Sequence, residues 1–449
     1  GHLYITRIPG IGVNERQEII ERMAEEGIAT NVHYKPLPMM TAYKTLGFDI
    51  KNYPNSYNRF INDKIRTVKP SGIRKYFDIA NEMGHVISLS VGEPDFQTPW
   101  HIREAGIDSL QRGKTWYTPN RGFSELRQEI SKYFERRFNV TYNPDTQILV
   151  TVGGSEAIDG AIRTIVSEGD EVLIPEPSFV CYNPLTRLAD GIPVTIETKA
   201  ENGFRLTAEE LESKITPKSK LLILPFPNNP TGAVMRKEHL EEIAKVVRKH
   251  NLFVLSDEIY GELTYGDTPH ISIASLEGMA ERTIVISGFS KSYAMTGWRL
   301  GYALGPKEII EQMTKLHQFA IMSAPTTAQY AAIEGLRHGD GDIEYMRNEY
   351  NIRRRLIVDG FTRMGLTCFE PEGAFYIFPS IKSTGLTSEE FCTKLIKSRR
   401  VAVIPGTAFG DCGEGYIRVS YSYSLGHIME ALNRIEMFIN DPEAPAMDS

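Results

Sequence analysis

The sequence predicts an α/β fold, with a large domain built on a mostly parallel sheet with helices on both faces and a smaller α+β domain. From about residue 147, short β-branched runs alternate with longer helical stretches, which is typical of βαβ units. In order, they are ILVTVGG, SEAIDGAIRTIVSEG, EVLIPE, KLLILPFP, HLEEIAKVVRKHN, LFVLSDEIY and RTIVISG. The length of 449 residues fits two or three domains.

The pattern changes after about Glu311. A long helical stretch over 346–363 precedes short strands in CFEPEGAFYIFPSI, VAVIPGTAFG and GYIRVSYSYS, interrupted by the helical stretch TSEEFCTKLIKSRR. This grouping predicts the smaller α+β domain. The expected divisions are an N-terminal arm with part of the small domain over 65–110, the large domain over 111–320, the small domain over 321–441 and a tail over 442–449.

The first 64 residues are expected to form their own strand-helix-strand unit. HLYITRI and TNVHY have the pattern of strands, Asn14 with Gln17 resembles a capping box, and Ile19, Ile20 and Met23 give the helix between them one apolar face. The segment holds eight Lys or Arg and seven Asp or Glu, a net charge of +1, so a basic DNA-binding arm is not expected.

The composition is that of a soluble globular protein, with 41% hydrophobic and 24% charged residues. A formal net charge of -7 argues against nucleic acid and membrane surfaces as partners. No apolar stretch reaches the roughly 18 residues of a membrane span and no signal pattern is seen, so we expect a cytoplasmic protein. The four cysteines and ten histidines show no metal-ligand spacing, and we expect no metal site.

Lys291 follows the apolar run Ile284–Ile286, an expected buried strand, in IVISGFSKSYAMTGWRLGY. A solvated loop lysine is the ordinary alternative. A serine-lysine nucleophile pair is excluded because Gly288 stands three residues before the lysine. A lysine near a core is suited to bonding a carbonyl cofactor, because desolvation lowers its pKa. The sequence therefore points to pyridoxal phosphate, whose phosphate and ring nitrogen need further partners.

A phosphate site is expected in VTVGGSEAIDGAI, where a strand, two glycines and a hydroxyl precede a helix. The N-terminus of a helix offers free amides and a positive dipole end to an anion. The candidate ligands are Gly154, Ser155 and the backbone amide of Glu156. An ordinary strand-to-helix turn is the alternative.

Three charged residues are candidates for the rest of the site. Asp257 ends the apolar run LFVLSD and is suited to keep a pyridine nitrogen protonated, although Ser256 or Asp257 could instead cap a helix. Tyr260 could reach the phenolic oxygen of the ring. Arg418 in GYIRVSYSYS is suited to a substrate carboxylate and Arg299 to the phosphate, because guanidinium forms paired hydrogen bonds; surface ion pairs are the alternative.

Stretches along the chain match one family in order: PSGIRKYFDIA, SLSVGEPDFQTP, WYTPNRGFSELR, TVGGSEAI, PEPSFVCY, FPNNPTGAV, SDEIY, SGFSKSYAMTGWRLGY, EGAFYIFP, VIPGTAFG and YIRVSYS. Through them the chain from about Ile65 to Phe438 resembles a fold-type I pyridoxal phosphate enzyme of the class I/II aminotransferase family, close to its bacterial aspartate-aminotransferase-like branch. The resemblance implies a ping-pong aminotransferase that moves the amino group of aspartate or a similar L-amino acid to a 2-oxo acid.

The resemblance also implies roles for single residues. Lys291 would bond the cofactor and move the proton of the substrate Cα, and Asp257 would pair with the ring nitrogen. Asn229 and Tyr260 would bond the ring oxygen, and Phe179 would stack on the ring.

The phosphate would be held by Gly154, Ser155, Ser287 and Arg299. Some relatives carry the phosphate-binding serine three residues before the lysine, where this chain has Gly288, so Ser290 is a substitute candidate for Ser287.

Further implied contacts concern the substrate and a second subunit. Arg418, Gly92 and Asn229 would contact the substrate. Tyr117 would reach the phosphate of a partner subunit, so a homodimer with shared active sites is expected.

One other enzyme class, one non-enzymatic function and one further resemblance stay open at this point. A carbon-sulfur β-lyase would use the same Lys291 and Asp257, and a regulatory module could bind pyridoxal phosphate without turnover. Residues 1–64 resemble the C-terminal end of a DegT-type sugar aminotransferase in HLYITRIPG, IATNVHYKPL and YPNSYNRF. The catalytic lysine of that family lies upstream of such a segment, so these residues are expected to be a fused remnant or a docking extension.

Overall fold

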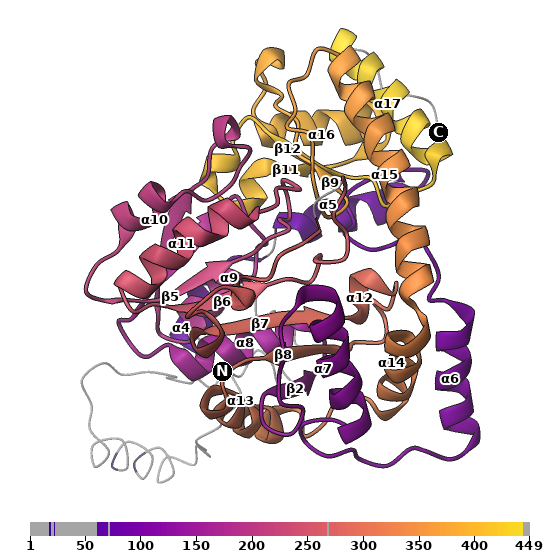
Figure 1. Cartoon of the computed structure of the whole chain (residues 1–449). Coiled ribbons are helices and arrows are strands. Elements are labelled where there is room, and N and C mark those ends of the chain that lie inside the picture. Colours follow the sequence, from indigo (N-terminus) through magenta and orange to yellow (C-terminus); the bar gives the residue numbers. More distant parts are fainter. Residues whose placement is uncertain (1–17, 19–21, 23–60, 71, 267–268, 443–449) are drawn as a thin grey trace. The chain divides into compact units, whose positions relative to one another are not determined.

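The computed structural model describes residues 18, 22, 61–70, 72–266 and 269–442 (Figure 1). The chain forms two compact units, Gly1–Lys69 and Pro70–Ser449. In the first, helix α4 (Asp63–Thr67) begins after Asn62, whose side chain accepts a hydrogen bond from the Lys64 amide at 2.9 Å. The strand-helix-strand prediction and the DegT-like resemblance fall outside the described residues, apart from positions 18 and 22, which are helical, and 61–64.

A seven-stranded sheet forms the centre of the second unit, in the order β2-β8-β7-β6-β5-β3-β4. Neighbours from β7 to β4 are parallel, whereas β8 is antiparallel to both β2 and β7. The fold class predicted from the sequence is confirmed. The strands are β2 (Ile148–Thr151), β3 (Glu171–Glu176), β4 (Ile192–Glu197), β5 (Ser219–Leu224), β6 (Phe253–Asp257), β7 (Thr283–Gly288) and β8 (Gly301–Leu304).

Helices cover both faces of this sheet, which explains why its strands are apolar without alternation. In β5, Leu221 and Ile223 share a buried cluster with α8 and α13, while Leu222 and Leu224 share another with α11. The helices between β1 and α15 in sequence are α6 (Trp100–Gln111), α7 (Ser124–Phe138), α8 (Gly154–Ile165), α9 (Tyr182–Leu188), α10 (Ala208–Lys214), α11 (Lys237–Lys249), α12 (Phe289–Ser292), α13 (Lys307–Ala320) and α14 (Thr326–His338).

The smaller α+β part contains a three-stranded sheet in the order β11-β12-β9 and a parallel pair of β1 with β10. The small part is made from two separate segments of the chain. One contains β1 and precedes the large sheet in sequence, and the other begins with α15 and follows it. The elements are α5 (Gly72–Met83), β1 (Ile87–Ser88), α15 (Asp340–Arg363), β9 (Tyr376–Ile377), α16 (Ser388–Arg399), β10 (Val401–Ala402), β11 (Ile404–Pro405), β12 (Ile417–Ser420) and α17 (Leu425–Asn440).

Among the described residues, no helix has both the length and the apolar character needed to cross a bilayer. The same part of the chain contains no cluster of three or more His, Cys, Asp or Glu side chains arranged for a metal ion. All four cysteines are free thiols.

His101 joins three helices of the second unit. Its Nδ1 lies 2.9 Å from Glu334 Oε1 on α14, and its Nε2 lies 2.9 Å from Asp342 Oδ2 on α15. Burial by itself lowers the pKa of His101, but the two carboxylates outweigh burial and hold that pKa above its usual value of 6.5. The imidazolium therefore stabilises the fold below about pH 6.5, and this contribution is lost as the pH rises through the folded-state pKa.

Replacing His101 with glutamine is expected to destabilise the protein more at about pH 6 than at about pH 9. The difference in the free energy of unfolding should stay below about 1 kcal/mol, because the three side chains are about one-third exposed. Urea unfolding of wild type and variant at both pH values measures it. His338→Gln, an exposed histidine on α14, is the control, and a loss of stability independent of pH would contradict the prediction.

Candidate active site

A cavity of about 320 Å³ opens beyond the carboxyl ends of the parallel strands, where ligands bind in open α/β sheets. It brings together residues from Gly92 to Arg418 that are far apart in the sequence. Of the residues predicted for the site, those that line it are Gly92, Gly154, Ser155, Phe179, Asn229, Asp257, Tyr260, Ser290, Lys291, Arg299 and Arg418. Glu156, Ser287 and Tyr117 do not line it.

Lys291 lies in α12, directly after β7, and its amine donates a hydrogen bond to the Gly92 carbonyl at 2.5 Å. Burial lowers the pKa of Lys291 to about 8, with Arg418 and Arg299 acting in the same direction against Glu93 and Asp257. The pKa of the amine is therefore shifted toward neutral pH, where part of the amine is unprotonated. This is the state that a nucleophilic or proton-accepting lysine requires.

Asp257 ends β6 and is buried. Its carboxylate accepts hydrogen bonds from the Tyr182 hydroxyl at 2.7 Å and from the Ile259 amide at 3.2 Å. Burial raises the pKa of Asp257 to about 6, although both hydrogen bonds favour the charged form. Turns follow Asp257 in place of a helix, so the helix-cap alternative for this residue is wrong.

Tyr182, on α9, was not predicted as a site residue, because a tyrosine three residues after Phe179 is typical of a buried core position. Its hydroxyl is suited to keep Asp257 charged. Tyr182→Phe is expected to raise the pKa of Asp257 and lower turnover about tenfold, because a hydrogen bond to a buried charge is lost.

The pH dependence of turnover measures the effect of Tyr182→Phe, and the acidic limb of the profile should move to higher pH. Tyr142→Phe is the matched control, because the buried Tyr142 hydroxyl has no hydrogen-bond partner. An unchanged profile in Tyr182→Phe would count against this role.

An anion cradle lies where β2 meets α8. Gly153 has a φ of 79°, which favours glycine, and a Cβ there would lie 2.6 Å from Arg299 Nη2 and displace that guanidinium. A Cβ at Gly301 would lie 2.6 Å from the Gly154 nitrogen, so the adjacent strand demands a glycine as well. No side chain caps the start of α8. The exposed Arg299 has no carboxylate partner among the described residues, which leaves its charge available to an anion.

The side chains of Glu156 and Ser287 have structural surroundings at this end of the cavity, while the role of the Glu156 backbone amide as a phosphate donor stays a prediction. The Glu156 carboxylate accepts hydrogen bonds from the Val152 amide and from His317, whose Nδ1 lies 2.6 Å from Glu156 Oε1. Ser287, within β7, lies directly opposite Tyr302 of the neighbouring antiparallel strand β8. Ser290 lines the cavity instead.

Arg418, in β12, is 1% exposed and has no carboxylate partner among the described residues. It donates hydrogen bonds to Asn229 Oδ1 at 3.1 Å and to the Ser90 carbonyl, while its Nε has no partner. Burial lowers the pKa of Arg418. A buried cation without a counterion is costly, so an anion is expected to complete this end of the cavity.

Tyr376 is a second residue that the sequence did not reveal, although EGAFYIFP contains it. Its hydroxyl lies 2.7 Å from the Tyr260 hydroxyl, and its ring lies under the Arg418 guanidinium at 4.7 Å. A Cβ at Gly92 would lie 2.2 Å from the Tyr376 hydroxyl oxygen. Gly92 therefore cannot carry a side chain without displacing Tyr376.

Tyr117 lies away from the cavity and is 79% exposed. Neighbouring apolar side chains are also exposed, including Trp116 and, at 88%, Phe319. Two hydrogen bonds hold these segments together, from Thr326 to the Trp116 carbonyl at 2.7 Å and from Asn120 to the Met322 carbonyl at 2.8 Å. Clustered apolar exposure of this kind marks an interaction surface.

These residues fit pyridoxal phosphate. An amine of lowered pKa stands near a buried carboxylate, an aromatic side chain and an open anion cradle, and the unpaired Arg418 Nε provides for a second anion. Each of these features was expected for this cofactor from the sequence.

Residues 84–435 match the family model "Aminotransferase class I and II", and the chain belongs to that family. It is a pyridoxal phosphate-dependent aminotransferase, as predicted. It is 53% identical over 381 residues to "Putative aminotransferase YugH" of Bacillus subtilis, covering 85% of this chain and 98% of that protein. It is 46% identical to the aspartate aminotransferase of Pyrococcus abyssi, over 85% and 98% of the two chains. The crystal structure of the aromatic aminotransferase from Pyrococcus horikoshii superimposes with a TM-score of 0.79 at 44% identity, covering 83% of this chain and 99% of that one.

Proposed function

We propose that the enzyme takes the amino group of aspartate or an aromatic L-amino acid and passes it to a 2-oxo acid in two half-reactions. Relatives named for aspartate and for aromatic amino acids support both donor classes. The observation that carries the proposal is the buried Arg418 guanidinium without a counterion in the same cavity as the Lys291 amine. Together they match the carboxylate and the reacting carbon of an amino acid.

Substrate binding and proton transfer are carried out by different residues of the cavity. Pyridoxal phosphate, when bound, carries the amino group between substrates and withdraws electrons from the substrate Cα. Arg418 binds the α-carboxylate through paired hydrogen bonds and so orients Cα. Lys291 Nζ accepts the proton that leaves Cα and later returns it.

Other residues hold the cofactor. Asp257 keeps the ring nitrogen protonated, Asn229 and Tyr260 bond the ring oxygen, and Phe179 lies against the ring. Gly154, Ser155, Ser290 and Arg299 bind the phosphate. Ser290 is preferred to Ser287, because Ser290 lines the cavity and Ser287 lies within β7 opposite Tyr302.

The test is a visible absorbance titration of the holoenzyme with single amino acids and no acceptor. Aspartate or tyrosine should convert the band of the lysine-bound cofactor to the amine form, with one equivalent of 2-oxo acid per site. Continuous release of ammonia and pyruvate from cysteine would identify a β-lyase instead. A spectrum that no amino acid changes would favour a regulatory module.

A homodimer is the second part of the proposal. Tyr117 is too exposed to serve its own cavity, and it sits in an apolar surface that a second copy would cover. Light scattering should give twice the chain mass. In addition, mixing Lys291→Ala with Tyr117→Ala subunits should restore activity, because one site of each mixed dimer is then intact. The cytoplasmic location stays a prediction, which fractionation of cells would test.

A further inference from the structure

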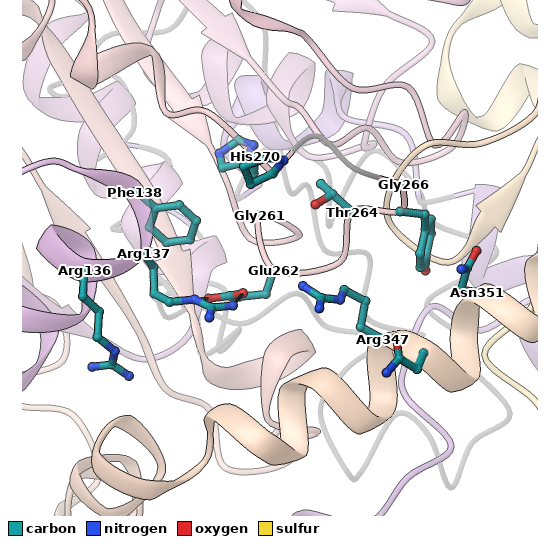
Figure 2. Close-up of a pocket in the computed structure, with 13 residues that line it drawn as sticks. Arg136, Arg137, Phe138, Gly261, Glu262, Thr264, Gly266, His270, Arg347 and Asn351 are labelled. Carbon is teal, nitrogen blue, oxygen red and sulfur yellow. Dashed lines mark hydrogen bonds and ion pairs between the residues drawn. The ribbon is translucent and has the colours of Figure 1, made fainter.

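The protein has a second cavity, of about 370 Å³, whose lining residues Figure 2 shows. Its walls come from the end of α7, from the segment after Tyr260 and from one face of α15. The catalytic cavity and this cavity share no lining residue. None of its residues has a part in the proposed reaction.

Among the described residues, the lining carries an excess of positive charge, with three arginines against one carboxylate, that of Glu262. Two of the arginines are already matched. Arg136 pairs with Asp340 at 2.6 Å, and Arg137 pairs with Glu262, which also accepts a hydrogen bond from the Tyr133 hydroxyl at 2.5 Å. The third arginine, Arg347, supplies the excess charge.

Arg347 makes no hydrogen bond within the described part of the chain. Within the described residues its one ion pair is with Glu344, at 3.6 Å, whose side chain is 64% exposed and therefore screened by water. Figure 2 shows the Arg347 side chain reaching from α15 into the cavity, toward the Arg137 and Glu262 pair. Five N–H donors on a fixed planar fork are left for a ligand.

Further donors stand beside Arg347 on the same face of α15. Asn348 has no side-chain hydrogen bond in the described structure, and Asn351 uses its carbonyl oxygen to accept from Arg354 at 3.0 Å, which leaves its amide N–H groups available. Arg347 and Asn351 are four residues apart and so lie side by side. A guanidinium flanked by amides suits a ligand with several anionic oxygens.

One short segment separates the two cavities. Asp257, Ile259 and Tyr260 line the catalytic cavity, and Gly261 and Glu262 line the second. This segment is tightly packed against His270, since a Cβ at Gly261 would lie 3.0 Å from the His270 ring. The Nε2 atom of His270 is hydrogen-bonded to Oε2 of the buried Glu258 at 2.9 Å. A ligand in the second cavity would therefore lie against the segment that carries Asp257 and Tyr260, which are proposed to hold the cofactor ring.

We propose that this second cavity binds a small oxyanion with at least two negative charges, a polycarboxylate or a phosphate, on Arg347, Asn348 and Asn351. Such a ligand joins α15 to the segment behind Asp257 and Tyr260. Its binding is thermodynamically coupled to the catalytic site, and the coupling acts equally in both directions. Binding itself does not depend on which amino acid the enzyme uses.

Calorimetric titration of the holoenzyme tests the proposal, with citrate and inorganic phosphate as separate probes and sodium chloride at matched ionic strength as the blank. One probe or both should bind saturably, and the stronger of the two identifies the ligand class. Arg347→Gln should weaken binding at least about tenfold while turnover without the probe stays within about twofold. Arg355→Gln, an exposed arginine on α15 outside the cavity, is the matched control and should bind normally.

A second variant separates the two cavities. Arg418→Gln should retain binding of the probe, because Arg418 belongs to the catalytic cavity. Loss of binding in this variant, or equal binding in wild type and Arg347→Gln, would overturn the proposal, as would saturable binding of neither probe. In the wild type the probe should also change the apparent affinity for aspartate in the absorbance titration, and no change would refute the coupling.

Discussion

Replacing Lys291 with alanine is expected to lower turnover by about 10⁴-fold or more, because one amine serves both as the covalent attachment of the cofactor and as the carrier of the Cα proton. The visible band of the lysine-bound cofactor should disappear with the amine. Steady-state assays with an amino acid and a 2-oxo acid, together with the absorbance spectrum, measure both effects.

The surroundings of Lys291 explain why no neighbour can replace it. The other cations that line the cavity, Arg299 and Arg418, are arginines, which stay protonated and cannot accept a proton. Lys245→Ala, an exposed lysine on α11 paired with Glu242, is the control and should be fully active. Activity of Lys291→Ala within tenfold of wild type would remove Lys291 from the mechanism.

Asp257→Ala is expected to lower turnover by about 10²- to 10³-fold, since the buried charge that favours a protonated ring nitrogen is lost. The cofactor should still attach, because Lys291 and the cradle around Arg299 are unchanged. The decisive measurement is the rate of the half-reaction with aspartate alone, followed by absorbance.

A surface carboxylate provides the comparison for Asp257. Asp159, on α8, pairs with Arg163 at 2.9 Å and is partly exposed, so Asp159→Ala removes the same charge without reaching the cavity. Equal half-reaction rates in the two variants would show that Asp257 acts only in folding. Loss of cofactor attachment in Asp257→Ala alone would show that the carboxylate is needed to bind the cofactor, contrary to the expected result.

Much of the site could be predicted because its residues follow the ends of apolar strands. Asp257 ends β6, Lys291 follows β7 and Gly154 follows β2. In a parallel sheet these ends lie along one edge, so local sequence is enough to place the three residues near one another. The glycine turn before α8 could be predicted for a similar reason, because the positive φ of Gly153 is a local property of that turn.

Other contacts depended on distant parts of the chain and could not be predicted. Tyr182 reaches Asp257 across 75 positions, and Tyr376 reaches Tyr260 across 116. Ser287 and Ser290 look equivalent as hydroxyls near Lys291. Only the folded chain places Ser287 within the sheet, opposite Tyr302 of the antiparallel β8, and Ser290 at the cavity.

The sequence by itself therefore determined the α/β class, the family, the cofactor and the residues at the strand ends, because periodicity and motif spacing are carried by neighbours along the chain. The tertiary structure decided which hydroxyls face the cavity, how the buried Arg418 is left without a counterion, and that α15 brings Arg347 behind the segment holding Asp257. These outcomes depend on packing between elements far apart in the sequence, and burial, which shifts pKa values and leaves charges unpaired, exists only once that packing has formed.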